Sequence, residues 1–408
     1  MGGAVMGGLT ISRRGESVPP SPIRKLVPLA DETRRRGVHV HGLNIGQPDI
    51  PTPDCMWEAL RRDLPRTLAY SPSGGIPELR EAFSGYYARH GIGLSSNEIL
   101  VTSGGSEAIL FAIGAIADPG EEVLIPEPLY ANYLGFSRFL GVQVAPITCD
   151  AANGYHLPPA EEWEKRITPK TRAILLCNPG NPTGTVYEES EVAMVRELAL
   201  RHDLYLVVDE VYREFCYDGR KHRSMLTLPG IEDRVILVDS ISKRFSACGA
   251  RIGCLATRAK PVFDTAMKFA QARLSPPGLG QIAAVPALSL PESYYQGFVR
   301  EFEARRNRVM EILEREPSIR CRRPRGAFYV MATLPVDDAE SYVRWMLTEY
   351  QKDGETVMVA PGDGFYATPG MGKQEIRLAY VFEEKVLSRA VSILVESLAH
   401  YPCLLYTS

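Results

Sequence analysis

Short apolar runs that alternate with helical stretches constrain the fold of this 408-residue chain more than any other feature. From about Asp54 to Leu288, runs of strand length alternate with helical stretches such as Glu188 to His202. This alternation is typical of α/β proteins, in which helices connect the strands of a parallel sheet. We therefore predict a large domain over residues 54–290, built as a three-layer, mostly parallel sheet.

A second, smaller unit follows Pro291. A long charged helix, Tyr294 to Glu316, leads to further strands and helices at Ala327–Thr333, Asp338–Gln351, Thr356–Val359, Glu375–Val381 and Glu384–His400. We predict a small α+β domain over residues 291–401. Residues 1–53 are expected to form an N-terminal arm and part of this small domain, and residues 402–408 carry no element signal and stay unassigned.

Three apolar runs of the large domain end directly in polar groups. They lead into S-G-G-S-E, N-P-G-N-P-T-G and D-E-V-Y, which begin at Ser103, Asn178 and Asp209. Because ligands of open parallel sheets bind beyond the carboxyl ends of the strands, we expect these groups to converge. Each has an ordinary alternative, since N-P-T-G is often only a turn and Asp frequently caps a helix. Their joint occurrence in one chain favours a binding site.

Lys243 lies just past the apolar run Val235 to Val238, with Ser240 three residues before it and Arg251 eight after it. A lysine amine forms an imine with an aldehyde when its pocket favours the neutral amine. A hydroxyl and a guanidinium suit a phosphate. Together these groups indicate pyridoxal 5'-phosphate as the cofactor, although the segment alone also fits a capped helix start with a surface lysine.

The polar groups at the other strand ends suit the same cofactor. Gly105 and Ser106 open a predicted helix, Glu107 to Ile116, whose free amides and positive dipole end favour a phosphate. Asp209, at the mouth of a buried strand, suits a protonated pyridine nitrogen. Asn181 and Tyr212 are candidates to hydrogen-bond the phenolic oxygen of the ring, and Tyr130 is a candidate to stack on the face of the ring.

In these motifs the chain resembles the fold-type I pyridoxal phosphate enzymes of the class I and II aminotransferase family, over nearly all of Ser21 to Tyr401. The shared features are Gly105-Ser106, N-P-T-G, D-E-V-Y, S-x-x-K, Arg251 and a late Arg377 in E-I-R-L-A. The resemblance implies a transaminase that moves an amino group from an L-amino acid to a 2-oxo acid by a ping-pong mechanism. It assigns catalytic roles to Lys243, Asp209 and Tyr212.

The resemblance also implies the substrate contacts and the assembly. Arg377 is expected to bind the α-carboxylate of the substrate, for which a two-pronged guanidinium is suited. Asn181 and the backbone of Gly46 are expected at the same end of the substrate. Tyr70 is similar to a tyrosine that reaches the cofactor phosphate of the neighbouring subunit, which implies a homodimer with shared active sites.

The preferred amino donor is less constrained. Some bacterial aspartate aminotransferases carry a lysine where this chain has Ser106, and there it binds the distal carboxylate. Arg273 lies near where other members place a distal-carboxylate arginine from the partner subunit, so we expect aspartate or glutamate, although a surface arginine at a helix end fits Arg273 equally well. The alternatives are an aromatic or alanine aminotransferase, or a carbon–sulfur lyase with the same cofactor contacts.

Composition argues against several other classes. The net charge of −3, without a basic stripe, disfavours nucleic acid. Apolar runs of strand length disfavour a membrane span, and eight scattered cysteines without a C-x-x-C pair disfavour a zinc site or a disulfide framework. Arg13, Arg14 and Glu16 interrupt the first twenty residues, which lack the hydrophobic region of a signal peptide and are expected to form a mobile arm. We expect a cytoplasmic enzyme without a metal.

Overall fold

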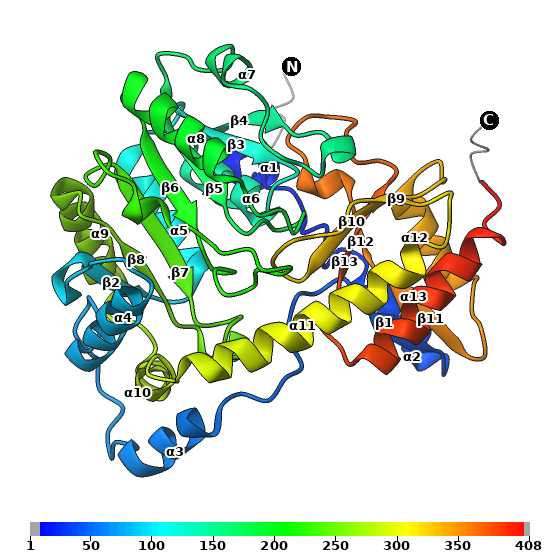
Figure 1. Cartoon of the computed structure of the whole chain (residues 1–408), viewed down its shortest axis with the longest axis horizontal. Coiled ribbons are helices and arrows are strands. Elements are labelled where there is room, and N and C mark those ends of the chain that lie inside the picture. The colour runs from blue at the N-terminus through cyan, green and yellow to red at the C-terminus, as the bar shows by residue number, and fades with distance from the viewer. Residues whose placement is uncertain (1–8, 404–408) are drawn as a thin grey trace, which may run out of the picture.

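The computed structural model describes residues 9–403, and its larger part is built on a seven-stranded sheet (Figure 1). The strand order is β2-β8-β7-β6-β5-β3-β4, and all neighbours are parallel except β8, which is antiparallel to β2 and β7. The strands are β2 (Ile99–Thr102), β3 (Glu122–Glu127), β4 (Gln143–Thr148), β5 (Thr171–Cys177), β6 (Tyr205–Asp209), β7 (Val235–Ser240) and β8 (Gly253–Ala256). The predicted mostly parallel α/β sheet is thus confirmed.

Helices cover both faces of this sheet, namely α4 (Pro77–Arg89), α5 (Gly105–Ile116), α6 (Asn132–Leu140), α7 (Ala160–Glu164), α8 (Glu189–Arg201), α9 (Lys260–Arg273) and α10 (Gly278–Ala287). Helix α3 (Asp54–Asp63) packs against α10. Strand side chains alternate between the two faces. In β7, Val235 and Leu237 therefore pack with α4, α8 and α10, whereas Ile236 and Val238 pack with α5, α6 and α9. The sheet is the middle of three layers.

A smaller part lies beside this sheet and has its own apolar core (Figure 1). Its antiparallel sheet has the order β12-β13-β10-β9, and β1 pairs in parallel with β11. The elements are α2 (Val27–Arg35), β1 (His39–Gly42), α11 (Glu292–Leu313), β9 (Arg320–Cys321), β10 (Tyr329–Thr333), α12 (Ala339–Thr348), β11 (Glu355–Met358), β12 (Ala360–Pro361), β13 (Glu375–Ala379) and α13 (Glu384–Leu398). The domain boundaries at 53/54 and 290/291 stay predictions.

Every helix and strand named from the sequence is present, with ends that differ by a few residues. Of the expected N-terminal arm, residues 1–8 lie outside the described part, and Arg13–Ser17 form a short exposed helix, α1, capped by Ser12. Of the unassigned tail, residues 404–408 lie outside the described part. Among the described residues, no helix is long and apolar enough to cross a membrane.

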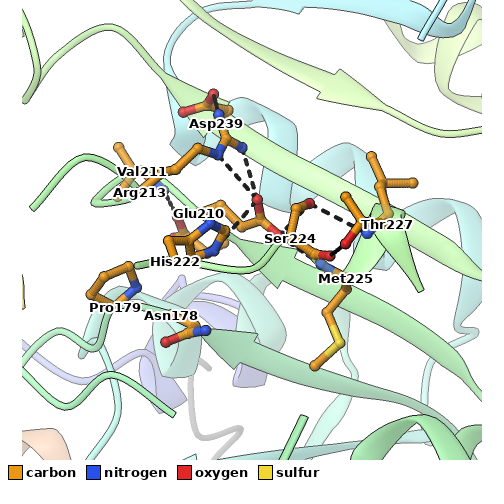
Figure 2. A network of polar contacts seen from close by, with 12 residues as sticks. Asn178, Pro179, Glu210, Val211, Arg213, His222, Ser224, Met225, Thr227 and Asp239 are labelled. Carbon is orange, nitrogen blue, oxygen red and sulfur yellow. Dashed lines mark hydrogen bonds and ion pairs between the residues drawn. The ribbon is translucent and has the colours of Figure 1, made fainter. Parts of the chain in front are cut away.

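Buried charged side chains pack against one another at the carboxyl ends of β6 and β7 (Figure 2). Arg213 donates to Glu210 at 2.8 Å and to Asp239 at 3.2 Å, and Arg244 donates to the second oxygen of Asp239. We call Glu210, Arg213, Asp239 and Arg244 the ionic layer. Charges without water are stable only when opposite charges and hydrogen bonds satisfy them, so the four residues depend on one another.

We expect Asp239→Asn to lower the free energy of unfolding by about 3–5 kcal/mol, because it leaves two buried arginines with one carboxylate fewer. Urea denaturation followed by circular dichroism measures the loss. Asp264→Asn is the matched control, since it removes an exposed carboxylate that pairs with Lys260 at 2.6 Å on the surface of α9. The control should change stability by less than about 1 kcal/mol. Equal effects of the two changes would contradict a stabilising role of the ionic layer.

Candidate active site

One pocket of about 520 Å³ lies at the carboxyl ends of β5, β6 and β7. All predicted site residues line this pocket except Tyr70 and Arg273. The predicted residues that line it are Gly46, Gly105, Ser106, Tyr130, Asn181, Asp209, Tyr212, Ser240, Lys243, Arg251 and Arg377. Tyr70 is 79% exposed. Arg273 donates to the carbonyls of Ser73 and Val101 outside this pocket. The strand ends therefore bring most of the predicted residues together, and two of them lie elsewhere in this chain.

The amine of Lys243 is half-buried in the pocket. It donates to the carbonyl of Gly46 at 2.8 Å and lies 3.8 Å from the sulfur of Cys248. Burial lowers the pKa of Lys243, and the positive charge of Arg377 acts in the same direction. A lowered pKa increases the neutral fraction of the amine, which is the nucleophilic form.

Asp209 is the last residue of β6 and points into the pocket, while the next residue, Glu210, belongs to the ionic layer. Its two oxygens accept hydrogen bonds from the Tyr133 hydroxyl at 2.8 Å and from the Val211 amide at 3.2 Å. Burial raises the pKa of Asp209 to about 6, against the opposing effect of these hydrogen bonds. A cation placed beside this carboxylate would lower its pKa and favour its charged form.

The N-terminus of α5 and Arg251 enclose one end of the pocket. Gly104 has φ 77° and caps α5 without a side chain, and a β-carbon there would lie 2.5 Å from Nη2 of Arg251. Arg251 donates to the carbonyl of Ser103 at 3.1 Å. Across the same space, a β-carbon on Gly105 would lie 3.8 Å from that of Ser240. Backbone amides, a hydroxyl and a guanidinium thus meet where a phosphate would fit.

Arg377 extends from the middle of β13 into the other end of the pocket and is 1% exposed. It donates to the side-chain oxygen of Asn181 at 2.9 Å and to the carbonyl of Asn44 at 2.5 Å. Its Nε has no hydrogen-bond partner among the described residues. Its guanidinium carbon lies 4.4 Å from the centre of the Tyr329 ring. A buried guanidinium with an unused N–H suits an anionic ligand.

Tyr329 is a pocket residue that the sequence did not identify. Its hydroxyl lies 2.8 Å from that of Tyr212, and a β-carbon on Gly46 would come within 1.9 Å of the same oxygen. Gly46 is therefore required by close packing and is more than a turn residue. Other pocket-lining or supporting residues without a predicted role include Arg24, Asn44, Asn132, Tyr133 and Cys248. An aromatic residue in a strand is usually a core residue, so the sequence gives no sign that Tyr329 lines a pocket. Its position follows only from the pairing of β10 with β13, the strand that carries Arg377.

Comparisons with known proteins agree with this geometry. The chain is 33% identical over 386 residues to the aspartate/prephenate aminotransferase of Thermus thermophilus, covering 93% of this chain and 97% of that protein. It is also 33% identical to aromatic-amino-acid aminotransferase 2 of Thermococcus litoralis, covering 95% and 99%. A mutant structure of Thermus thermophilus aspartate aminotransferase superposes with a TM-score of 0.87 at 31% identity, covering 96% of this chain and all of that one.

The structure of an alanine aminotransferase from Pyrococcus furiosus gives the same TM-score of 0.87 at 28% identity and covers 96% of this chain and all of that one. The sequence model of the family "Aminotransferase class I and II" matches residues 38–394. These findings confirm the family resemblance, the fold and the transaminase activity predicted from the motifs. The chain belongs to the class I and II aminotransferase family and is an aminotransferase with the fold-type I architecture.

Proposed function

We propose that this pocket binds pyridoxal 5'-phosphate at Lys243 and transfers amino groups between an L-amino acid and a 2-oxo acid by a ping-pong mechanism. One observation carries the proposal above the others. A lysine with a lowered pKa shares a single pocket with a buried carboxylate at one strand end and a glycine-capped helix start at another. Such a set of groups fits an aldehyde, a cationic ring nitrogen and a phosphate in one molecule.

The phosphate is assigned to the enclosed end of the pocket. The first-turn amides of α5, which include those of Gly105 and Ser106, have no side-chain cap and carry the positive end of the helix dipole. Ser240 supplies a hydroxyl and Arg251 a guanidinium that line the same space. The fit of these donors to a dianion supports the assignment.

The ring is assigned to the middle of the pocket. Asp209 would pair with the protonated ring nitrogen, which would lower the pKa that burial raises and so favour the charged carboxylate. Asn181 and Tyr212 would donate to the phenolic oxygen, and Tyr130 would stack on the face of the ring. Tyr130 is positioned by Asn132, whose amide donates to its hydroxyl at 2.7 Å.

When bound, the cofactor supplies an aldehyde carbon that accepts amines and a ring that withdraws electrons from the carbon attached to the amine. Nζ of Lys243 would hold the cofactor in the absence of substrate, and as a free neutral amine it would take the proton from the substrate α-carbon as a general base. The same amine returns a proton as a general acid. Release of the first 2-oxo acid precedes binding of the second substrate, which makes the kinetics ping-pong.

The substrate α-carboxylate is assigned to Arg377, with Asn181 and the backbone of Gly46 beside it. The unpartnered Nε of Arg377 supports this role. We propose aspartate or glutamate as the donor, in keeping with the relatives named aspartate aminotransferases. An aromatic or alanine aminotransferase is the second candidate, because relatives with those names align over similar lengths. A carbon–sulfur lyase would instead release pyruvate and ammonia.

We further propose a cytoplasmic homodimer in which Tyr70 reaches the cofactor phosphate of the partner subunit. Tyr70 is exposed, as are Leu64 and Leu68, each at 64%, and Leu274 at 51%. The segments of Tyr70 and Leu274 lie side by side, since Arg273 donates to the carbonyl of Ser73 at 3.0 Å. Exposed apolar side chains close to one another mark surfaces that bind other proteins. The eight cysteines are all free, which suits a reducing compartment. Sedimentation of the purified enzyme tests the dimer.

We expect Lys243→Ala to retain bound cofactor and to lose turnover, because the phosphate contacts of Ser240 and Arg251 remain while the reacting amine is gone. Absorbance spectra of the purified protein before and after desalting, together with the steady-state rate, measure both properties. Lys260→Ala, on the exposed surface of α9, is the control and should behave as the wild type. An unchanged spectrum and rate in Lys243→Ala would remove this lysine from the mechanism.

Asp209→Ala should lower kcat by several orders of magnitude, because the ring nitrogen then lacks the carboxylate that keeps it protonated. The dimer and the circular dichroism spectrum should persist. Steady-state kinetics with saturating donor and acceptor provide the measurement. A decrease of less than about tenfold, equivalent to about 1.4 kcal/mol, would leave Asp209 with a structural role only.

Arg377→Lys should raise KM for every amino donor by a similar factor, since all donors share the α-carboxylate and lysine cannot make the two-pronged bond. Single-donor half-reactions, in which the absorbance change of the cofactor is followed without an acceptor, measure this for each of the twenty amino acids. The same screen identifies the preferred donor. An increase restricted to some donors would contradict the assignment of Arg377 to the α-carboxylate.

A further inference from the structure

The charged groups of the active-site pocket leave one cation without a role. Four cationic side chains line the pocket, namely Arg24, Lys243, Arg251 and Arg377, together with one carboxylate, that of Asp209. Under the proposed function, Lys243 holds the cofactor, Arg251 the phosphate, Asp209 the ring nitrogen and Arg377 the α-carboxylate. Only Arg24 remains, and a cation that lines a substrate pocket attracts an anionic group of the substrate.

The backbone that carries Arg24 is fixed, whereas its side chain is not. Pro22 packs against Gly364, and Ile23 is 8% exposed in a small core with Phe365. The carbonyl of Ile23 accepts a hydrogen bond from the Asn44 side chain at 2.7 Å. The side chain of Arg24 is exposed and has neither a hydrogen bond nor an ion pair with another residue of the described range 9–403.

The neighbouring residue Lys25 shows the contrast. Its amine pairs with Glu340 and lies 3.6 Å from Asp363, so its charge is already neutralised within the protein. The charge of Arg24 acts instead on the pocket. Burial raises the pKa of Tyr130, and the charges of Arg377, Arg24 and Arg251 oppose that rise.

Arg273 is less suited to the same role within its own chain. It is bound to the carbonyls of Ser73 at 3.0 Å and Val101 at 3.4 Å, and it lies 3.5 Å from the carboxylate of Glu107. Its Nε and Nη1 have no hydrogen-bond partner among the described residues, but Arg273 does not line the pocket, whereas Arg24 does. The pocket lining therefore favours Arg24.

We propose that Arg24 binds the distal carboxylate of a dicarboxylic amino acid and of the corresponding 2-oxo acid, and so determines the substrate class. The proposal rests on the proposed function and deepens it. The donor is held at both ends, with its α-carboxylate on Arg377 and its second carboxylate on a guanidinium from the N-terminal segment. A planar guanidinium makes the two-pronged bond that carboxylates prefer.

The test compares Arg24→Gln with the wild-type holoenzyme in half-reactions with glutamate, aspartate, alanine, phenylalanine and O-phosphoserine. Loss of a charge-assisted hydrogen bond predicts that the ratio of kcat/KM for glutamate to that for alanine falls by about ten- to a hundredfold. Arg24→Lys should restore part of the ratio. Equilibrium binding of succinate, which has two carboxylates and no amine, should weaken by a similar factor in Arg24→Gln.

Arg315→Gln, an exposed arginine just past the end of α11, is the matched control and should leave the ratio near its wild-type value. Arg273→Gln is measured in the same assays. A fall in the ratio with Arg273→Gln but not with Arg24→Gln would overturn the proposal in favour of Arg273. An equal loss for all donors, or a wild-type preference for alanine or phenylalanine, would also overturn it. A higher kcat/KM for O-phosphoserine than for both dicarboxylic acids would overturn the proposal, because it would mean that Arg24 binds a phosphate group of the substrate and not a carboxylate. Failure of the proposed function itself would appear in the wild-type enzyme, which would react with none of the five donors.

Discussion

The ion pairs that Arg213 and Arg244 share with the buried carboxylate of Asp239 are the interaction on which the active site depends. Asp239 immediately precedes Ser240, and Arg244 immediately follows Lys243. Because neighbouring side chains of an extended strand point to opposite sides, Ser240 faces the pocket while Asp239 joins the ionic layer. The same alternation separates the pocket residue Asp209 from Glu210. The ionic layer thus fixes the backbone that carries these pocket side chains. Its ion pairs are buried, so water does not compete for them.

Burial has a different effect on each charged group of the pocket. It lowers the pKa of Lys243 and raises that of Asp209, which brings a base and an acid toward the neutral range from opposite directions. Arg377 is also buried, and its Nε has no hydrogen-bond partner within residues 9–403. A group that is poorly solvated and incompletely bonded gains more from a charged ligand than an exposed one would. The pocket is therefore suited to charged ligands by groups that are already in place.

Much of the fold and of the pocket could be predicted from the sequence because the information is local. Apolar runs that end in Ser103, Asn178 and Asp209 identify both the strands and their carboxyl ends, and parallel strands place those ends at one edge. Contacts between distant segments carry no such signal. The close approach of Tyr329 to Gly46 and the position of Arg24 depend on how the N-terminal segment lies against β10 and β13. Strand β8 is also difficult to predict, because four residues that begin with glycine give little periodicity.

The parallel pairing of β1 with β11 joins His39 to Glu355, so a short strand near the start of the chain finds its partner only near the end. During synthesis on a ribosome, the segment that carries Ile23, Arg24 and Gly46 therefore emerges long before the strand that anchors it. The large sheet, whose strands all lie between Ile99 and Ala256, has its complete set of partners much earlier. The wall of the pocket that carries Arg24 and Gly46 is thus the last to be assembled, after the sheet whose strands lead to Asp209 and Lys243.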